Sequence, residues 1–194
     1  TPLPYTDLNL FIPILKKKQI VYASRIEKGK GWELFLEAIY LLVKEKQICD
    51  YEVYICGSGS QDKFLKDKLF QYNLDKSIKL TGYIDMEDIL PQSRIFLSLQ
   101  ENENYPSQVL LEAISSGCAC IITNVGNSWM LAKKDFSQLV EPKAEDISKA
   151  IQNYIKLSDN DFSILSQNAR KFANENFDIN KSITYYSQLL KDNM

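Results

Sequence analysis

The sequence contains no histidine among its 194 residues. This absence excludes a Ser-His-Asp or Cys-His catalytic arrangement, and any metal site with histidine ligands, within the chain. The four cysteines form no Cys-x-x-Cys pair, so the spacing of a zinc or redox motif is missing too. Because Cys49, Cys56, Cys118 and Cys120 lie next to or within apolar runs, we expect buried, reduced thiols and no bound metal.

Long apolar runs and a strong net charge are also missing. The longest apolar stretches, such as 20–23 and 109–111, are far shorter than the roughly 20 residues that cross a bilayer, and no secretory signal pattern opens the chain. The net charge is -2, from 23 basic and 25 acidic residues, so no overall field attracts nucleic acid. These features predict a cytoplasmic protein without a transmembrane segment or a nucleic-acid partner, in which any anion is bound locally.

The composition and length are those of one ordinary globular domain. Residues 1–18 carry three prolines followed by three lysines, which suits an extended lead-in better than a core element. We therefore interpret residues 1–18 as a linker and residues 19–194 as the domain.

From residue 19 onward, short β-branched runs alternate with longer segments of helical period. Strands are predicted at 19–24, 51–56, 78–81, 95–99, 118–123 and 138–140. Helices are predicted at 32–46, 61–72, 86–90, 107–116, 146–157, 161–175 and 179–191, with a further short helix after 124–128. This alternation predicts an α/β fold: a Rossmann-like, doubly wound parallel sheet of about six strands with flanking helices and a helical C-terminal tail.

Two strand-to-helix turns are candidates for binding an anion. The first holds Arg25 and Lys30 with two glycines, and parallel sheets present ligands at this carboxyl edge. Arginine offers a fork to phosphate oxygens, and lysine adds a point charge. The second contains Gly57 and Gly59. The alternative for the first turn is a solvated basic turn. The alternative for the second is a plain tight turn, because the full G-x-G-x-x-G spacing of a dinucleotide site is absent.

A polar, acidic loop leads into the helix predicted from Ser107. The helix N-terminus can donate amides to a phosphate or sugar above the sheet, while Glu112, one turn further on, can accept from hydroxyl groups. The alternative is that Glu112 is a surface carboxylate that stabilises the first helical turns.

Taken in order, these segments resemble the C-terminal domain of the GT-B glycosyltransferases, specifically the large retaining group called family four. The resemblance covers the chain from about residue 19 to its end. It rests on the Arg-x4-Lys-Gly turn, the glycine turn after the second strand, the Gly-Tyr-Ile run at 82–84, Leu-Leu-Glu-Ala at 110–113, Gly117 before a hydrophobic strand, and Asn-Val-Gly at 124–126.

The resemblance implies roles for particular residues. Arg25 and Lys30 would neutralise the diphosphate of a nucleotide sugar, and Glu112 would accept hydrogen bonds from the ribose; these three form the expected catalytic set. The expected donor-binding residues are Gly57, Gly59, Tyr83, Ile84, Glu103, Asn104, Tyr105, Pro106, Ser107, Gln108 and Val109. The donor would be a UDP-sugar, with a GDP-sugar as the alternative, and no cofactor would be tightly bound.

One position departs from the family pattern. The family pairs two glutamates as E-x7-E, whereas counting back from Glu112 reaches Asn104, and Glu103 lies one residue too far. Either Asn104 replaces the acid or the loop bulges to bring Glu103 into its place.

The family resemblance also implies a partner domain. A GT-B enzyme has two Rossmann-like domains, and the acceptor side, a glycan or lipid, belongs to the N-terminal one. We therefore expect this chain to be the donor half of a hexosyltransferase that is inactive by itself, at the inner face of the membrane if the missing domain attaches there. A non-catalytic nucleotide-binding or scaffolding domain is the alternative.

Overall fold

The computed structural model describes residues 4–192, so residues 1–3 of the expected linker and residues 193–194 lie outside the described part. Six strands form one parallel sheet: β1 (Lys17–Ala23), β2 (Glu52–Cys56), β3 (Ile78–Gly82), β4 (Ser93–Ser98), β5 (Ala119–Thr123) and β6 (Ser137–Val140). Their order across the sheet is β3-β2-β1-β4-β5-β6, so β1 and β4 are the central neighbours. Strands β2 and β3 follow on one side of β1, and β4, β5 and β6 follow on the other. This order confirms the doubly wound fold.

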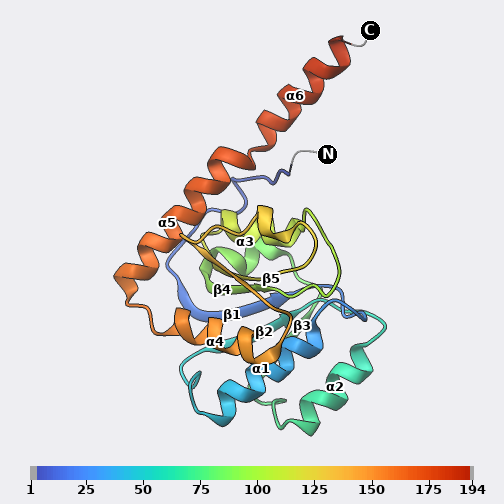
Figure 1. The fold of residues 1–194 in the computed structure, drawn as a ribbon, viewed down its shortest axis with the longest axis vertical. Coiled ribbons are helices and arrows are strands. Elements are labelled where there is room, and N and C mark those ends of the chain that lie inside the picture. Colours follow the sequence, from blue (N-terminus) through green and yellow to red (C-terminus); the bar gives the residue numbers. More distant parts are fainter. Residues whose placement is uncertain (1–3, 193–194) are drawn as a thin grey trace.

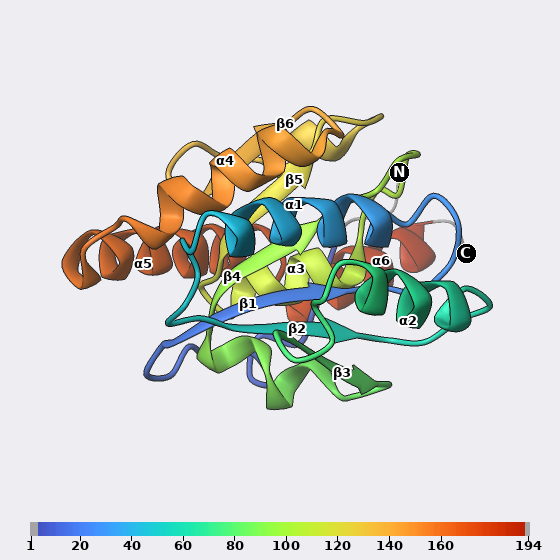
Figure 2. The ribbon, with the colours of Figure 1, turned by 90° about the horizontal axis from the view of Figure 1, so that it is seen from below.

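The helices cover both faces of the sheet (Figures 1 and 2). The α-helices are α1 (Trp32–Lys44), α2 (Asp62–Gln71), α3 (Gln108–Ser115), α4 (Ala144–Ile155), α5 (Asp159–Asn176) and α6 (Ile179–Asp192). Helices α1, α2 and α4 lie on one face and α3 and α5 on the other, while α6 projects beyond the body of the domain. The expected helix at 86–90 is instead two 3-10 turns, η1 (Met86–Asp88) and η2 (Leu90–Gln92), and a third, η3 (Ser128–Met130), follows β5.

Burial explains why these segments form their elements. All six residues of β4 are buried, as expected for a central parallel strand that is covered on both faces. In α4, the apolar residues Ile147, Ala150, Ile151 and Tyr154 recur at helical spacing, and all are buried. The buried strands and the apolar faces of the helices thus contribute their side chains to one continuous core.

One cysteine differs from the prediction. Cys56, Cys118 and Cys120 are buried and unpaired, but Cys49 is exposed. Cys49 lies in the connection between α1 and β2, where its thiol lies 3.3 Å from the carbonyl oxygen of Lys46. The apolar neighbours Ile48 and Tyr51 made Cys49 resemble a core position, whereas the turn directs its side chain outward.

Candidate donor-binding site

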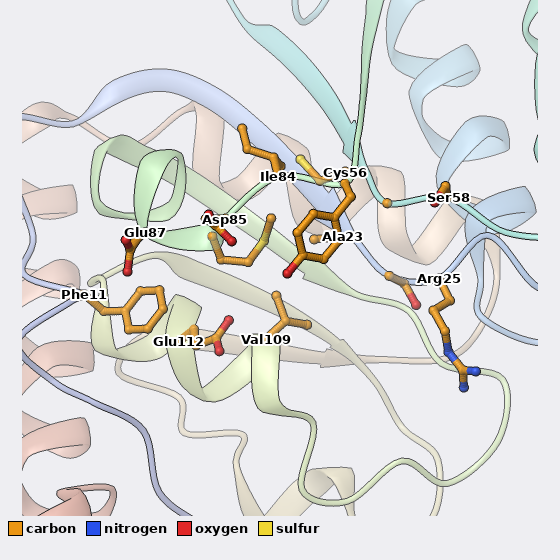
Figure 3. A pocket seen from close by; sticks show the side chains of 14 residues that line it. Phe11, Ala23, Arg25, Cys56, Ser58, Ile84, Asp85, Glu87, Val109 and Glu112 are labelled. Atoms are coloured by element: carbon orange, nitrogen blue, oxygen red, sulfur yellow. The ribbon is translucent and has the colours of Figure 1, made fainter.

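A cavity of about 610 Å³ opens at the carboxyl edge of the sheet. The turns after β1, β2 and β3 form one side of it, and α3 forms the other (Figure 3). In an open parallel sheet, ligands bind where the strand order reverses, here between β1 and β4. The cavity therefore lies where the topology predicts a ligand.

Six of the residues expected from the sequence line this cavity: Arg25, Gly57, Tyr83, Ile84, Val109 and Glu112. The other expected residues do not line it: Lys30, Gly59, Glu103, Asn104, Tyr105, Pro106, Ser107 and Gln108. Most of this second group belongs to the loop between β4 and α3. The structure thus brings the first turn and α3 to one hollow, while the acidic loop does not line it.

The turns after β1 and β2 are held together as one unit. The amide of Ile26 donates to the carbonyl of Ser58 at 3.1 Å. The carboxylate of Glu27 accepts from the backbone amide and the hydroxyl of Ser60, at 2.9 and 2.5 Å. These two hydrogen bonds lower the pKa of Glu27, with the hydroxyl contributing most, so the carboxylate stays ionised in its clasp with Ser60.

Glycine is required where these turns approach their neighbours. Gly31 precedes α1 with φ +81°, and a Cβ added there would lie 1.6 Å from the carbonyl oxygen of Leu99, at the end of β4. Gly57 has φ +122°, and its Cβ would lie 2.0 Å from the carbonyl oxygen of Ser24. The backbones therefore pack more closely than any side chain permits, and Gly57 forms part of the cavity wall.

The two cations of the first turn are placed differently. Arg25 is exposed at one end of the cavity, and its guanidinium points out of the apolar part of the hollow (Figure 3). Lys30 does not line the cavity, and its carbonyl accepts a 2.7 Å hydrogen bond from the buried hydroxyl of Tyr22. This bond fixes the backbone of Lys30 close to the N-terminus of α1.

Helix α3 carries Val109 and Glu112 on the side that faces the cavity. Burial raises the pKa of the Glu112 carboxyl, and the hydrogen bond from the side-chain amide of Gln108, at 3.2 Å, partly offsets this shift. A half-buried carboxylate with one partner can accept further hydrogen bonds from hydroxyl groups of a ligand. The structure thus does not place Glu112 on the open surface.

Glu103, one of the two candidates for the first glutamate position of E-x7-E, has partners in the turn after β5. The Glu103 carboxylate accepts hydrogen bonds from the side-chain amide of Asn127, at 2.6 Å, and from its backbone amide, at 3.3 Å. Glu103 therefore ties the loop after β4 to the turn after β5. Asn104 is exposed, and Ser107 precedes α3 as its cap residue without a capping hydrogen bond from its side chain.

Sequence reasoning missed several residues of the cavity, among them Phe11, Ser24, Ser58, Asp85, Met86 and Glu87. Ser24 and Ser58 adjoin residues that were expected, so inclusion of whole turns would have found them. Phe11 had no such signal, because it lies in the segment interpreted as a linker.

Within residues 4–192, no group of three or more potential metal-ligand side chains gathers in one place. The same residues include no helix that is long and apolar enough to cross a membrane.

The family model of the glycosyl transferases group 1 matches residues 12–172. The chain belongs to this family. A relative from Escherichia coli, UDP-Gal:alpha-D-GlcNAc-diphosphoundecaprenol alpha-1,3-galactosyltransferase, is 29% identical over 195 residues, which cover 96% of this chain and 49% of that protein. Membership in the glycosyl transferases group 1 agrees with the strand order and the position of the cavity.

Two solved structures share the fold of this group 1 domain. Anabaena HepE, in complex with UDP and glucose, has a TM-score of 0.84 and 16% identity over 96% of this chain and 55% of that chain. The C-terminal domain of a group 1 protein, LpcC from Francisella tularensis, has a TM-score of 0.76 and 23% identity over 90% of this chain and 99% of that chain. This chain thus spans about half of the Escherichia coli relative and of Anabaena HepE, but nearly all of an isolated C-terminal domain.

Proposed function

We propose that this chain is the donor-binding domain of a retaining hexosyltransferase that uses a UDP-sugar. The observation that carries the proposal is that, in a group 1 glycosyltransferase fold, Arg25, Val109 and Glu112 line one cavity at the carboxyl edge of the sheet. Two findings support UDP over GDP: the Escherichia coli relative is named for UDP-Gal, and Anabaena HepE is in complex with UDP.

The charges of the cavity suggest how the donor lies. The diphosphate would lie at the end formed by Arg25 and the two joined turns, with the backbone of Gly57 close by and Lys30 contributing at longer range. Positive charge at that end would stabilise the nucleoside diphosphate as it leaves with the electrons of the glycosidic bond. Glu112 would bind the ribose, and the backbone of Tyr83 and Ile84 would line the base.

The sugar would extend toward the loop and the first turn of α3, from Asn104 to Val109. In this scheme the Glu103–Asn127 contact holds the loop in place, and Asn104 takes the position of the first family glutamate. An oxygen of the donor's own phosphate would accept the proton of the acceptor hydroxyl, which gives retention without a basic side chain of the protein.

The acceptor would bind to a second domain. The Escherichia coli relative is about twice as long as this chain, so we propose that a preceding domain, joined through residues 1–18, binds the glycan or lipid. The domain described here would then bind the donor in the cytoplasm, close to the membrane if the preceding domain is peripheral there, without transferring the sugar alone.

Calorimetric titration of the chain with UDP and GDP tests this function. Arg25→Ala should weaken UDP binding about 10- to 150-fold, the equivalent of a lost charge-assisted hydrogen bond of about 1.5–3 kcal/mol. Lys28→Ala is the matched control, since Lys28 is an exposed cation of the same turn that does not line the cavity. If neither nucleotide binds at millimolar concentration, or if both variants behave alike, the donor-site function is wrong.

A further inference from the structure

Residues 6–16, which precede β1, contact the rest of the domain at several points. The amide of Thr6 donates to the carbonyl of Phe177 at 2.9 Å, and the amide of Ile14 donates to the carbonyl of Pro91 at 3.1 Å. The ammonium of Lys16 donates to the carbonyl of Ser116. We call residues 6–16 the N-terminal strap, because these contacts hold it against the end of α5, η2 and the C-terminal end of α3.

One arginine joins the strap to α3. Nη1 of Arg170, on α5, donates to the carbonyl oxygens of Phe11 and Ser115, at 2.9 and 3.0 Å, and Nη2 donates to that of Leu8 at 3.0 Å. Ser115 is the last residue of α3, the helix that carries Glu112. A single guanidinium therefore fixes the position of Phe11 relative to α3.

Phe11 is 6% exposed, and its ring forms one end of the cavity. Figure 3 shows the ring beside Glu112 and across from Glu87, at the opposite end from Arg25. The cavity thus has a cationic end, a carboxylate on α3, and an aromatic end provided by the strap.

We propose that Phe11 is a donor-binding residue that contacts the nucleobase, and that Arg170 is the residue that positions it. This inference rests on the proposed function. If the diphosphate lies at Arg25 and the ribose at Glu112, the base comes next along the cavity and meets Phe11. A planar base packs well on an aromatic ring, whereas a diphosphate gains nothing from it.

Phosphorus-31 NMR titration of the 194-residue chain with UDP and with inorganic pyrophosphate tests the contact. Phe11→Ala should weaken UDP binding roughly 5- to 100-fold, as expected for a lost base–aromatic contact, and should leave pyrophosphate binding unchanged. Phe11→Tyr, which keeps the ring, should retain most of the UDP affinity. Equal losses for UDP and pyrophosphate, or no loss for UDP, would show that Phe11 only packs the strap.

A mutant cycle tests the role of Arg170. Arg170→Ala should reduce UDP affinity and not pyrophosphate affinity, and the double variant with Phe11→Ala should be no weaker than Phe11→Ala alone. Arg170→Lys serves as a second variant if the alanine variant does not fold, and Lys171→Ala, on the exposed side of α5, is the control. Additive losses in the double variant would show that Arg170 does not act through Phe11.

This experiment separates the two proposals. Absence of UDP binding by the wild-type chain would refute the proposed function itself. Normal UDP binding by both the wild-type chain and Phe11→Ala would refute only the contact between Phe11 and the base.

Discussion

Replacement of Gly31 by alanine tests whether close backbone packing shapes the turn beside the cavity. The added Cβ would lie 1.6 Å from the carbonyl oxygen of Leu99, and real Cβ contacts essentially never fall below 3.0 Å. Backbone would therefore have to move by about 1.4 Å, the difference between these two distances. We expect a loss of about 1–2 kcal/mol in the free energy of unfolding from the left-handed conformation, and about 1–3 kcal/mol more from overpacking.

Gly82→Ala is the matched control. Gly82 also has a positive φ, +65°, but a Cβ there would meet no atom within 4 Å. Gly82→Ala should lose only about 1–2 kcal/mol of the free energy of unfolding, from the left-handed backbone conformation. Urea unfolding measures the difference in the free energy of unfolding between the two variants. Unchanged m-values would show that a shift of the midpoint reports stability alone. Gly31→Ala should also weaken UDP binding, because the turn that ends at Gly31 carries Arg25, which lines the cavity. Equal stability of the two variants would refute the close contact between Gly31 and Leu99.

Further substitutions probe two carboxylates, Glu112 in the cavity and Glu27 in the first turn. Burial raises the pKa of Glu112, so its ionised form opposes folding, and this unfavourable contribution to stability should disappear as the pH falls through the folded-state pKa of Glu112. Glu112→Gln should therefore be more stable than wild type at neutral pH in urea unfolding, yet bind UDP about 1.5–3 kcal/mol more weakly; undiminished affinity would contradict the ribose role. Glu27→Ala should weaken UDP binding by loosening the two turns, and Ser60→Ala should reproduce this loss in calorimetry. Because the pKa of Glu27 is lowered, the contribution of the Glu27–Ser60 contact to UDP affinity should persist until the pH falls below the ordinary glutamate range. Unequal losses for Glu27→Ala and Ser60→Ala would show that UDP affinity does not depend on the hydrogen bonds between Glu27 and Ser60.

The sequence by itself determined the architecture. Helical period in segments such as 146–157 and short β-branched runs such as 118–123 predicted the alternating elements, and element boundaries moved by only a few residues, because parallel strands are buried on both faces and so read as apolar runs. The order of the local motifs along the chain was also enough to predict the family. These motifs, such as the turn at 25–31, are short segments that can be recognised in the sequence without the tertiary structure.

Only the tertiary structure decided which residues share the cavity. Phe11 reaches it from a segment that resembles a linker, because Arg170, 159 residues away, holds that segment against α3. Glu103 is likewise held by Asn127, a contact that no local pattern predicts. Such contacts join residues that are distant along the chain, and they depend on distances that appear only when the strands have taken their order in the sheet.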